Sequence, residues 1–349
     1  MRKMLRVPVL TNTDMRIRIA DGVIGNSQNI HRENEVIKSF GVNKVLYDRN
    51  KFPKNPLEHR HILFAGLDPY RALVILLKER SADAILCVFE NTALFLLLFR
   101  HLFFFKPPIV LLEVSPRGWR LRDMVLDYVV PRVDLVIVLT NDQKKVVERN
   151  WKTKRPVKVV DWYVDEEFFK VTELPLDGYV LSVGEDVSRD FETLVAACAK
   201  INARLVLKTR KDVKIPDEFR DKVLVIDKKI SGKELFELYK AARVVVVPLT
   251  PTENPGGISS ILEAMSVGRP VVASATGVPL HVLTDRLDGV IVPPCDVESL
   301  AAALQELLTD DALATRLGKA ARKTVEARFA FPARQRKFAD ALHELVEDR

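Results

Sequence analysis

The chain has 349 residues, of which 48% are hydrophobic and 29% are charged. This length is enough for two domains of ordinary size, and the composition is that of a globular protein, which excludes a disordered or fibrous chain. The three cysteines, Cys87, Cys198 and Cys295, are odd in number and far apart. We therefore expect buried thiols in a reducing compartment, with neither a disulfide framework nor zinc-ligand spacing.

The formal net charge of +7 is unevenly distributed. Residues 1–170 carry 29 Lys and Arg against 20 Asp and Glu, whereas the remainder carries 25 against 27. A basic first half indicates an anionic partner, for which a membrane surface, an acidic acceptor and nucleic acid are candidates; a solvated surface without a partner is the alternative. Because no recognised motif interleaves the basic residues with aromatic ones, we expect no nucleic acid.

In the first half, short β-rich runs alternate with helical stretches. Because Arg6 and Pro8 interrupt the apolar residues among the first ten, we expect no signal peptide there. We expect buried strands at Lys44–Tyr47, His61–Phe64, Ala84–Phe89, Ile109–Val114 and Leu135–Leu139. We expect helices at Pro69–Lys78, Thr92–Phe105 and Asn141–Trp151.

The most apolar stretch runs from Ala93 to Phe105 and contains Arg100 and His101. As a helix it would rise about 20 Å, which is too short for a hydrocarbon core of roughly 30 Å. Two alternatives remain: a buried core helix, or a helix that enters one leaflet of a membrane, which the nearby Arg and Lys residues keep open.

Periodicity is lost between Asp165 and Asp177, and we place a domain boundary there. Residues 1–170 are expected to form one domain, residues 171–330 a second, and residues 331–349 a helix that can cross back to the first domain. In the second domain we expect strands at Tyr179–Val183, Leu205–Lys208, Val223–Ile226, Val244–Pro248 and Val271–Ser274, and helices at Phe191–Lys200, Lys233–Ala241 and Ile258–Val267. The sequence thus predicts an α/β fold with two doubly wound domains that bind ligands at the carboxyl ends of their strands.

Residues 244–277 carry the strongest chemical signal. An apolar strand ends at Pro248, and the pair Gly256-Gly257 then leads into a helix. Paired glycines let the backbone approach a ligand, and the free N–H groups of a first helical turn favour a phosphate. Glu263 lies five residues beyond Ile258, about 7–8 Å along the helix axis. A ribose attached to a bound diphosphate would lie there, where a carboxylate can bind both of its hydroxyls.

The run GGISSILEAMSVGRPVVASATGVP, followed by DGVIVPPCDVESLAAALQELLTDD, resembles the donor-binding domain of retaining family 4 glycosyltransferases. VDLVIVLTNDQKKVVERNW with VKVVDWYVDEEFF, and SVGEDVSRDFETLVAA, are similar to other parts of the same family, so that the likeness covers residues 109–345. The resemblance implies a GT-B fold, in which two Rossmann-like domains face each other across a cleft. It also implies an enzyme that transfers a sugar from a nucleotide-diphosphate sugar to an acceptor with retention of configuration.

The resemblance also implies roles for single residues. Glu263 matches the second glutamate of the family's E-x7-E pattern, which holds the donor ribose, and Arg189 matches the basic residue that neutralises the diphosphate. We expect both to act in catalysis. The other residues expected to bind the donor are Gly184, Lys208, Arg210, Glu253, Asn254, Gly256, Gly257, Ile258 and Ser259.

The sequence departs from the family at two places. Pro255 stands where the family has its first glutamate, so Glu253 or Asn254 would have to reach the donor sugar instead. No histidine follows the strand at Ile109–Val114, where the family commonly has one. The residues expected to form the acceptor side of the cleft after this strand are Glu113, Ser115, Arg117 and Arg120.

No D-x-D motif is present, so we expect neither a metal nor another cofactor, and the nucleotide sugar is the donor substrate. The expected acceptor is a glycan or a lipid-linked molecule. The basic first half and the apolar stretch favour a cytoplasmic protein placed peripherally at the inner face of the membrane. Two alternatives are a non-catalytic nucleotide-sugar-binding protein derived from a transferase, which Pro255 and the missing histidine favour, and a GT-B-type sugar-nucleotide epimerase.

Overall fold

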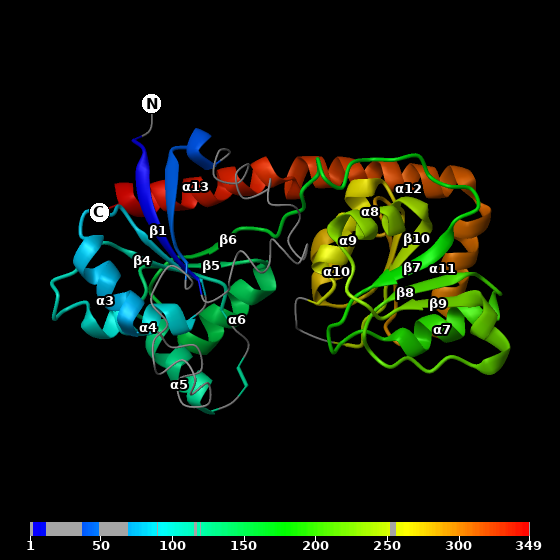
Figure 1. Cartoon of the computed structure of the whole chain (residues 1–349), viewed down its shortest axis with the longest axis horizontal. Coiled ribbons are helices and arrows are strands. Elements are labelled where there is room, and N and C mark those ends of the chain that lie inside the picture. The colour runs from blue at the N-terminus through cyan, green and yellow to red at the C-terminus, as the bar shows by residue number, and fades with distance from the viewer. Residues whose placement is uncertain are drawn as a thin grey trace. The chain divides into compact units, whose positions relative to one another are not determined.

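The computed structural model describes residues 3–11, 37–48, 69–88, 90–114, 117–118, 120–251 and 256–348. Its contacts divide the chain into two units, Met1–Asp161 with Arg334–Arg349, and Trp162–Ala333 (Figure 1). The division falls after Asp161 rather than at residue 170. The reason is that Phe169 is buried in the core of the second unit, where its ring lies 6.0 Å from that of Tyr239.

The first unit is built on a parallel sheet with the strand order β2-β1-β3-β4-β5-β6. Strands β4 and β5 are buried along their whole length and consist of apolar residues, as is typical of a parallel sheet covered on both faces. The strands are β1 (Leu5–Thr11), β2 (Val42–Asp48), β3 (Ile85–Val88), β4 (Ile109–Leu112), β5 (Leu135–Val138) and β6 (Val157–Val159).

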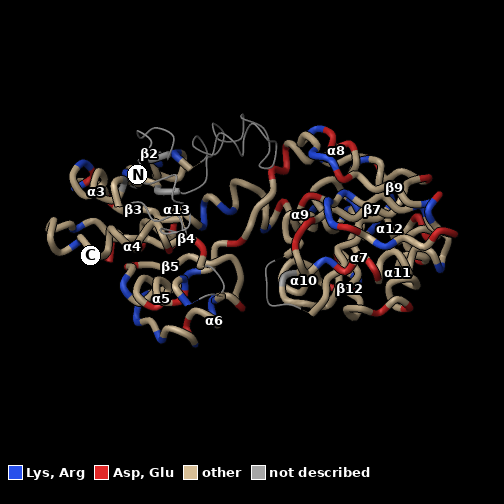
Figure 2. The backbone as a smooth tube through the Cα atoms, turned by 60° about the horizontal axis from the view of Figure 1, so that its bottom comes forward, with Lys and Arg blue, Asp and Glu red and all other residues tan. Residues whose placement is uncertain are grey.

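Helices cover both faces of this sheet. One face packs against α3 (Pro69–Lys78), α4 (Glu90–Phe99), α5 (Arg120–Val129) and α6 (Asn141–Trp151). The other face packs against the last helix, α13 (Phe331–Glu347), through Phe338 and Leu342. Figure 2 marks the basic and acidic residues along the backbone of both units.

The first unit differs from the expected elements near its start and around α4. The first residues form strand β1, because Leu5, Val7 and Val9 point to the core with the period of two that Arg6 and Pro8 obscured. The helix expected to reach Phe105 ends at Phe99, and α5 was not expected. The strand expected at His61–Phe64 lies outside the described residues.

The second unit repeats the plan with a parallel sheet of order β12-β11-β10-β7-β8-β9. Its strands are β7 (Tyr179–Val183), β8 (Leu205–Lys208), β9 (Val223–Ile226), β10 (Ala242–Val247), β11 (Val271–Ser274) and β12 (Val290–Val292). One face packs against α7 (Phe191–Lys200), α11 (Val297–Thr309) and α12 (Asp311–Thr324). The other packs against α8 (Gly232–Ala241), α9 (Ile258–Val267) and α10 (Gly277–Val282), with a short 3-10 helix at Asp217–Lys222 and a π-helical turn at Val325–Phe329 completing the unit.

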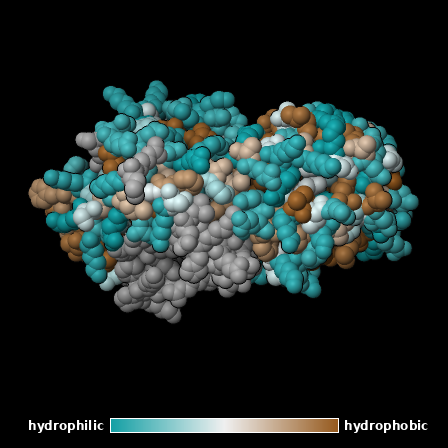
Figure 3. All heavy atoms as spheres, turned by 90° about the horizontal axis from the view of Figure 1, so that it is seen from above, coloured by the Kyte–Doolittle hydropathy of each residue, from teal (hydrophilic) through white to brown (hydrophobic). Residues whose placement is uncertain are grey.

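Local signals start and stop these helices. Asp190 caps α7 by accepting a hydrogen bond from the backbone N–H of Thr193, and Ser231 and Glu234 form a capping box at the start of α8. Gly268 ends α9 with a φ of 80°, a conformation that glycine adopts most easily. Within the described part of the chain, no helix is long and apolar enough to cross a membrane. Hydrophilic residues cover most of the described surface in the view of Figure 3.

Candidate functional site

The candidate site lies at the carboxyl edge of the second sheet. Strands β7 and β10 are parallel neighbours, so the loops that follow Val183 and Val247 leave the same edge side by side. The first loop carries Asp186 and Arg189, and the second leads to Gly256 and α9. An isolated bridge joins Arg189 to Leu249, so the two loops are also held together by their backbones.

The start of α9 has the form expected of an anion-binding turn. Gly257 is the N-cap residue with a φ of 83°, and no side chain caps the helix. The N–H groups of the first turn are therefore open to a ligand, and the helix dipole favours a negative charge there. A Cβ atom on Gly256 would lie 2.8 Å from Asp186 Oδ1 and from Ser188 Oγ, so only glycine allows this close approach of the two loops.

Arg189 is buried beside this helix start. Its side chain is 1% exposed, its Nε donates to Asp186 Oδ2 at 2.8 Å, and its Nη2 donates to Ser260 Oγ at 3.1 Å. Nη1 is buried and has no hydrogen-bond partner among the described residues. A buried charged donor without a partner is costly, so its presence beside an open helix N-terminus indicates a site prepared for an anion.

The loop around Arg189 is held by further polar contacts. Burial alone would raise the pKa of Asp186, but the charge of Arg189 and the hydrogen bonds from Ser188 and Arg189 lower it below its usual value. Asp186 therefore stays a carboxylate and fixes the guanidinium. Lys211 donates from Nζ to the carbonyl oxygen of Asp186 at 3.1 Å, which fixes the backbone of the same loop. A Cβ on Gly184 would lie 2.2 Å from Arg189 Nε, so the arginine also needs a glycine at that position.

Glu263 lies further along α9 and is partly buried. Burial raises its pKa to about 7, although a hydrogen bond from Tyr239 and the charge of Arg189 both act to lower it. The Tyr239 hydroxyl donates to Glu263 Oε2 at 2.8 Å. Since burial also raises the pKa of Tyr239 well above its usual value, the phenol keeps its proton and remains the donor. Glu263 is thus poised to change its charge near neutral pH.

The remaining donor-side candidates differ in their surroundings. Ile258 is buried and Ser259 exposed in the first turn of α9. Lys208 is 8% exposed at the end of β8, and its Nζ lies 3.6 Å from Glu185 Oε1. Arg210 is exposed and forms an ion pair with Glu185, so this arginine is already neutralised at the surface. Glu253 and Asn254 lie outside the described residues.

The structure adds three residues that sequence reasoning missed: Ser260, Tyr239 and Asp186. Ser260, rather than the exposed Ser259, contacts the guanidinium of Arg189, and its own hydroxyl donates to the Val183 carbonyl at 2.8 Å. Helical periodicity could have indicated the burial of Ser260. It lies three residues before Glu263, on the same side of the helix, and directly before the buried Ile261. Nothing in the sequence marks Tyr239, which comes from the separate helix α8.

The acceptor-side candidates belong to the first unit. Glu113 directly follows β4 and has a φ of 63°, a left-handed conformation that is strained for a residue with a side chain and recurs at functional sites. Arg117 forms an ion pair with Asp127 and lies over the ring of Trp151 at 5.1 Å. Arg120 is exposed at the start of α5. Ser115 lies outside the described residues.

The described residues contain no group of three or more His, Cys, Asp or Glu side chains suited to holding a metal ion. The buried cysteines Cys87 and Cys198 have pKa values raised to about 12 by burial, so their thiols are inert.

Parts of the chain are similar in sequence to known glycosyltransferases. Residues 217–324, which include Tyr239, the Gly256-Gly257 turn and Glu263, match the family described as Glycosyl transferases group 1. The match covers about a third of the chain and lies within the second unit. An uncharacterized glycosyltransferase of Methanocaldococcus jannaschii is 33% identical over 143 residues, which are 38% of this chain and 36% of that protein. A D-inositol 3-phosphate glycosyltransferase of Kribbella flavida is 40% identical over 87 residues, 25% of this chain and 20% of that protein.

The alignments therefore span only about a fifth to a third of the length of these curated group 1 relatives. Solved structures match more of the chain at lower identity. Sucrose-phosphate synthase of Thermosynechococcus elongatus has a TM-score of 0.74 at 23% identity, with both chains covered completely. HepE of Anabaena, solved with UDP-glucose, has a TM-score of 0.68 at 15% identity, covering 97% of this chain and 100% of that one. These likenesses confirm the predicted α/β fold class, that of GT-B proteins.

Proposed function

We propose that the protein is a glycosyltransferase that moves a sugar from a nucleotide-diphosphate sugar to an acceptor. The observation that carries this proposal is the buried Arg189, whose guanidinium lies beside the open N-terminus of α9 and whose Nη1 has no partner among the described residues. Two positive features of this kind suit the two phosphates of a donor. The named group 1 relatives, and the UDP-glucose bound by the HepE protein, support the same donor class.

In the proposed complex, the diphosphate binds the first-turn N–H groups of α9 and Arg189. These groups stabilise the negative charge that develops on the leaving nucleoside diphosphate, and Lys208 adds positive charge from β8. Glu263 accepts hydrogen bonds from the ribose hydroxyls about 7–8 Å along the helix. We further propose that this charge compensation makes a metal unnecessary, and that the leaving phosphate receives the acceptor proton so that the anomeric configuration is retained.

We propose a glycan or lipid-linked acceptor, bound by the first unit near Glu113 and Arg120. The excess of basic residues in residues 1–170 supports an anionic acceptor and a peripheral position at the inner face of a membrane. A lipopolysaccharide core biosynthesis glycosyltransferase of Rhizobium meliloti is 28% identical over 158 residues, and its name supports such an acceptor class.

A product assay tests the proposal. The protein is incubated with UDP-, GDP- and ADP-sugars and glycan or lipid acceptors, and the released nucleoside diphosphate and the anomeric signal of the product are measured by NMR. Transfer with the donor's anomeric configuration is expected, with and without EDTA. Nucleotide binding without any product would favour the non-catalytic alternative, which Pro255 at the family's glutamate position supports, and a changed nucleotide sugar without transfer would favour an epimerase.

A further inference from the structure

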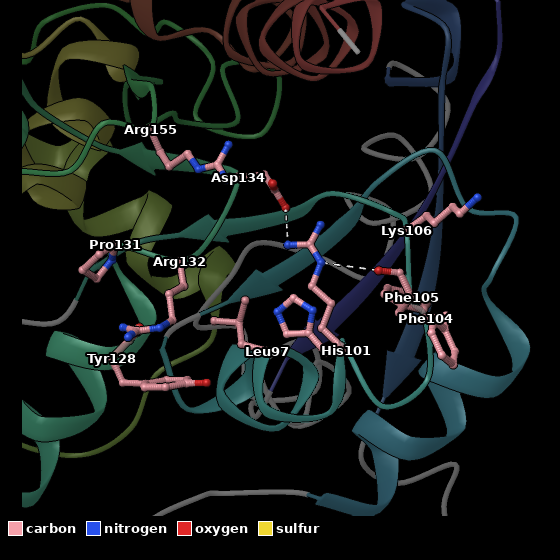
Figure 4. Close-up of a pocket in the computed structure, with 11 residues that line it drawn as sticks. Leu97, His101, Phe104, Phe105, Lys106, Tyr128, Pro131, Arg132, Asp134 and Arg155 are labelled. Atoms are coloured by element: carbon pink, nitrogen blue, oxygen red, sulfur yellow. Dashed lines mark hydrogen bonds and ion pairs between the residues drawn. The ribbon is translucent and has the colours of Figure 1, made fainter.

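A cationic site separate from the candidate donor site lies in the first unit, at the amino edge of its sheet. Glu113 lies at the opposite, carboxyl edge. A pocket of about 860 Å³ opens at the amino ends of β4, β5 and β6 (Figure 4). We call it the amino-edge pocket. Its lining includes Arg100, His101, Phe104, Lys106, Arg132 and Arg155. These residues come from the segments that enter three neighbouring strands, so the sheet itself holds them together.

The charge of this pocket is strongly positive. Asp134 is the single carboxylate in its lining, and it accepts hydrogen bonds from Arg100 Nη1 at 3.0 Å and from the backbone N–H of Ile109 at 2.9 Å. One carboxylate beside four Lys and Arg side chains leaves the lining with a net positive charge. Arg132 donates from Nη1 to the Tyr128 carbonyl at 2.9 Å, and its guanidinium lies 4.3 Å from the centre of the Tyr128 ring. Neither contact cancels its charge, and it stays exposed together with Arg155.

Apolar side chains project beside these cations. Leu98 is 45% exposed, Leu102 is 70% exposed and Phe104 is 86% exposed. They lie at the end of α4 and in the turn after it, whereas Leu96 and Leu97 of the same helix are buried against the sheet. The apolar stretch is thus half core and half surface, and the surface half adjoins the basic pocket.

The turn that presents Phe104 is strained. The N–H of Phe105 donates to the carbonyl of Arg100 at 2.9 Å and the N–H of Phe104 donates to that of His101 at 3.2 Å, which is the Schellman pattern of a helix end. Phe104 holds the left-handed position of this motif, with a φ of 48°, where glycine is usual. Folding gains nothing from an exposed ring in a strained conformation, so Phe104 points to a contact outside the chain.

We propose that this face docks on an anionic phospholipid membrane, with the amino-edge pocket receiving lipid phosphate groups while Phe104 and Leu102 enter the interface. Basic side chains around exposed apolar ones are the complement of such a surface. Docking here leaves the carboxyl edge of the sheet clear, because the four residues of β4 separate the two edges by about 13 Å. This docking rests on the proposed function, in which the protein binds peripherally to a membrane, and it names the face of the first unit that would contact the lipids.

Co-sedimentation of the full chain with vesicles tests this proposal, without donor or acceptor present. Vesicles of phosphatidylcholine alone are compared with vesicles containing equal parts of phosphatidylglycerol. Binding to the anionic vesicles only, and its loss at high salt, is expected. The double variant Arg132→Glu with Arg155→Glu should weaken binding by at least about 25-fold, because each basic residue near an anionic surface contributes roughly a factor of five.

The matched control is Lys144→Glu with Lys145→Glu, which makes the same charge change on α6 at the opposite edge of the sheet and should bind as the wild type does. Phe104→Gly relieves the strained turn, so it should melt no lower than the wild type yet bind vesicles more weakly. Equal loss in both double variants would overturn the proposal in favour of net charge alone. It would also be overturned by binding of inorganic phosphate without vesicle binding, or by self-association through Phe104. UDP titration of each variant tests the donor site separately.

Discussion

The two cationic sites of this protein are built in opposite ways. At the carboxyl edge of the second sheet, one buried guanidinium is fixed by Asp186 and Ser260 and leaves a single nitrogen without a partner. At the amino edge of the first sheet, Arg132 and Arg155 are exposed and lie around an open pocket. A buried, fixed charge suits one ligand in one geometry, whereas exposed charges suit a surface and are screened by salt. The difference predicts selective binding at the first site and electrostatic, salt-dependent binding at the second.

The largest effect is expected at Arg189. Arg189→Ala should weaken nucleotide binding by about 2–5 kcal/mol, because it removes a desolvated charge that faces the diphosphate. Arg189→Lys should recover little, since an ammonium group cannot contact Asp186, Ser260 and a phosphate in the same fork geometry. Isothermal titration with the preferred nucleoside diphosphate measures both. The control is Arg220→Ala, which removes an exposed arginine paired with Asp217 and should leave affinity unchanged. Equal affinities in all four proteins would remove Arg189 from the site.

Glu263 is expected to contribute next. Glu263→Ala should weaken nucleotide binding by about 1.5–3 kcal/mol, the value of charge-assisted hydrogen bonds to the ribose. The wild type should bind a 2′-deoxy nucleotide less tightly than the ribonucleotide, whereas Glu263→Ala should bind the two equally well. This result would assign the contact of Glu263 to the ribose. Glu237→Gln, on the exposed face of α8, is the matched control. An unchanged dissociation constant in Glu263→Ala would contradict the assignment.

Tyr239 should tune that carboxylate. Ribose hydroxyls bind the charged form of Glu263, so nucleotide affinity should rise as the pH increases through about 7. The bond from Tyr239 lowers the Glu263 pKa, so Tyr239→Phe should move this midpoint to higher pH and cost about 1 kcal/mol at neutral pH. Titrations across pH measure the midpoint, and Glu263→Gln separates it from the titration of the nucleotide itself. A midpoint that stays in Glu263→Gln would exclude the carboxylate as its source.

The smallest expected effect is on stability. The pKa of Glu263 is raised in the folded protein, so the folded state binds the proton more tightly than the unfolded chain does. The corresponding stability is fully present below the unfolded pKa, near 4.3, and is lost as the pH rises through about 7. Glu263→Gln cannot ionise and should therefore lose less stability than the wild type between pH 5 and pH 8. Denaturant unfolding at the two pH values, evaluated with no nucleotide present, measures this difference; parallel losses would contradict the raised pKa.

Sequence patterns predicted the second unit better than the first. Strands β7, β8, β9 and β11 and helices α7 and α9 have the expected bounds, because buried parallel strands are continuous apolar runs, Asp190 caps α7, and glycines flank α9. Strand β1 was missed because a charged residue and a proline interrupt its period-two pattern. The end of α4 was misplaced because the apolar run continues past Phe99 through turns, and their left-handed residue, Phe104, is not a glycine.

The site was predictable only where neighbouring residues share one turn or one helix. Gly256, Gly257 and Glu263 were predicted from spacing along α9, whereas the role of Arg189 was predicted from the family resemblance. The contacts of Arg189 with Ser260, and of Tyr239 with Glu263, join elements that are far apart in the sequence and arise from tertiary packing. The roles of Glu253, Asn254 and Ser115 remain predictions, since these residues lie outside the described ranges.

The central claim is that the edge formed by Arg189 and α9 binds the nucleoside diphosphate of a sugar donor. Calorimetric titration with UDP, GDP and ADP in the presence of EDTA, on the wild type and on Glu263→Ala, tests it most directly. The wild type should bind one of these nucleotides tightly, and Glu263→Ala should bind it much more weakly or not at all. Absence of binding by the wild type to all three nucleotides would contradict the account.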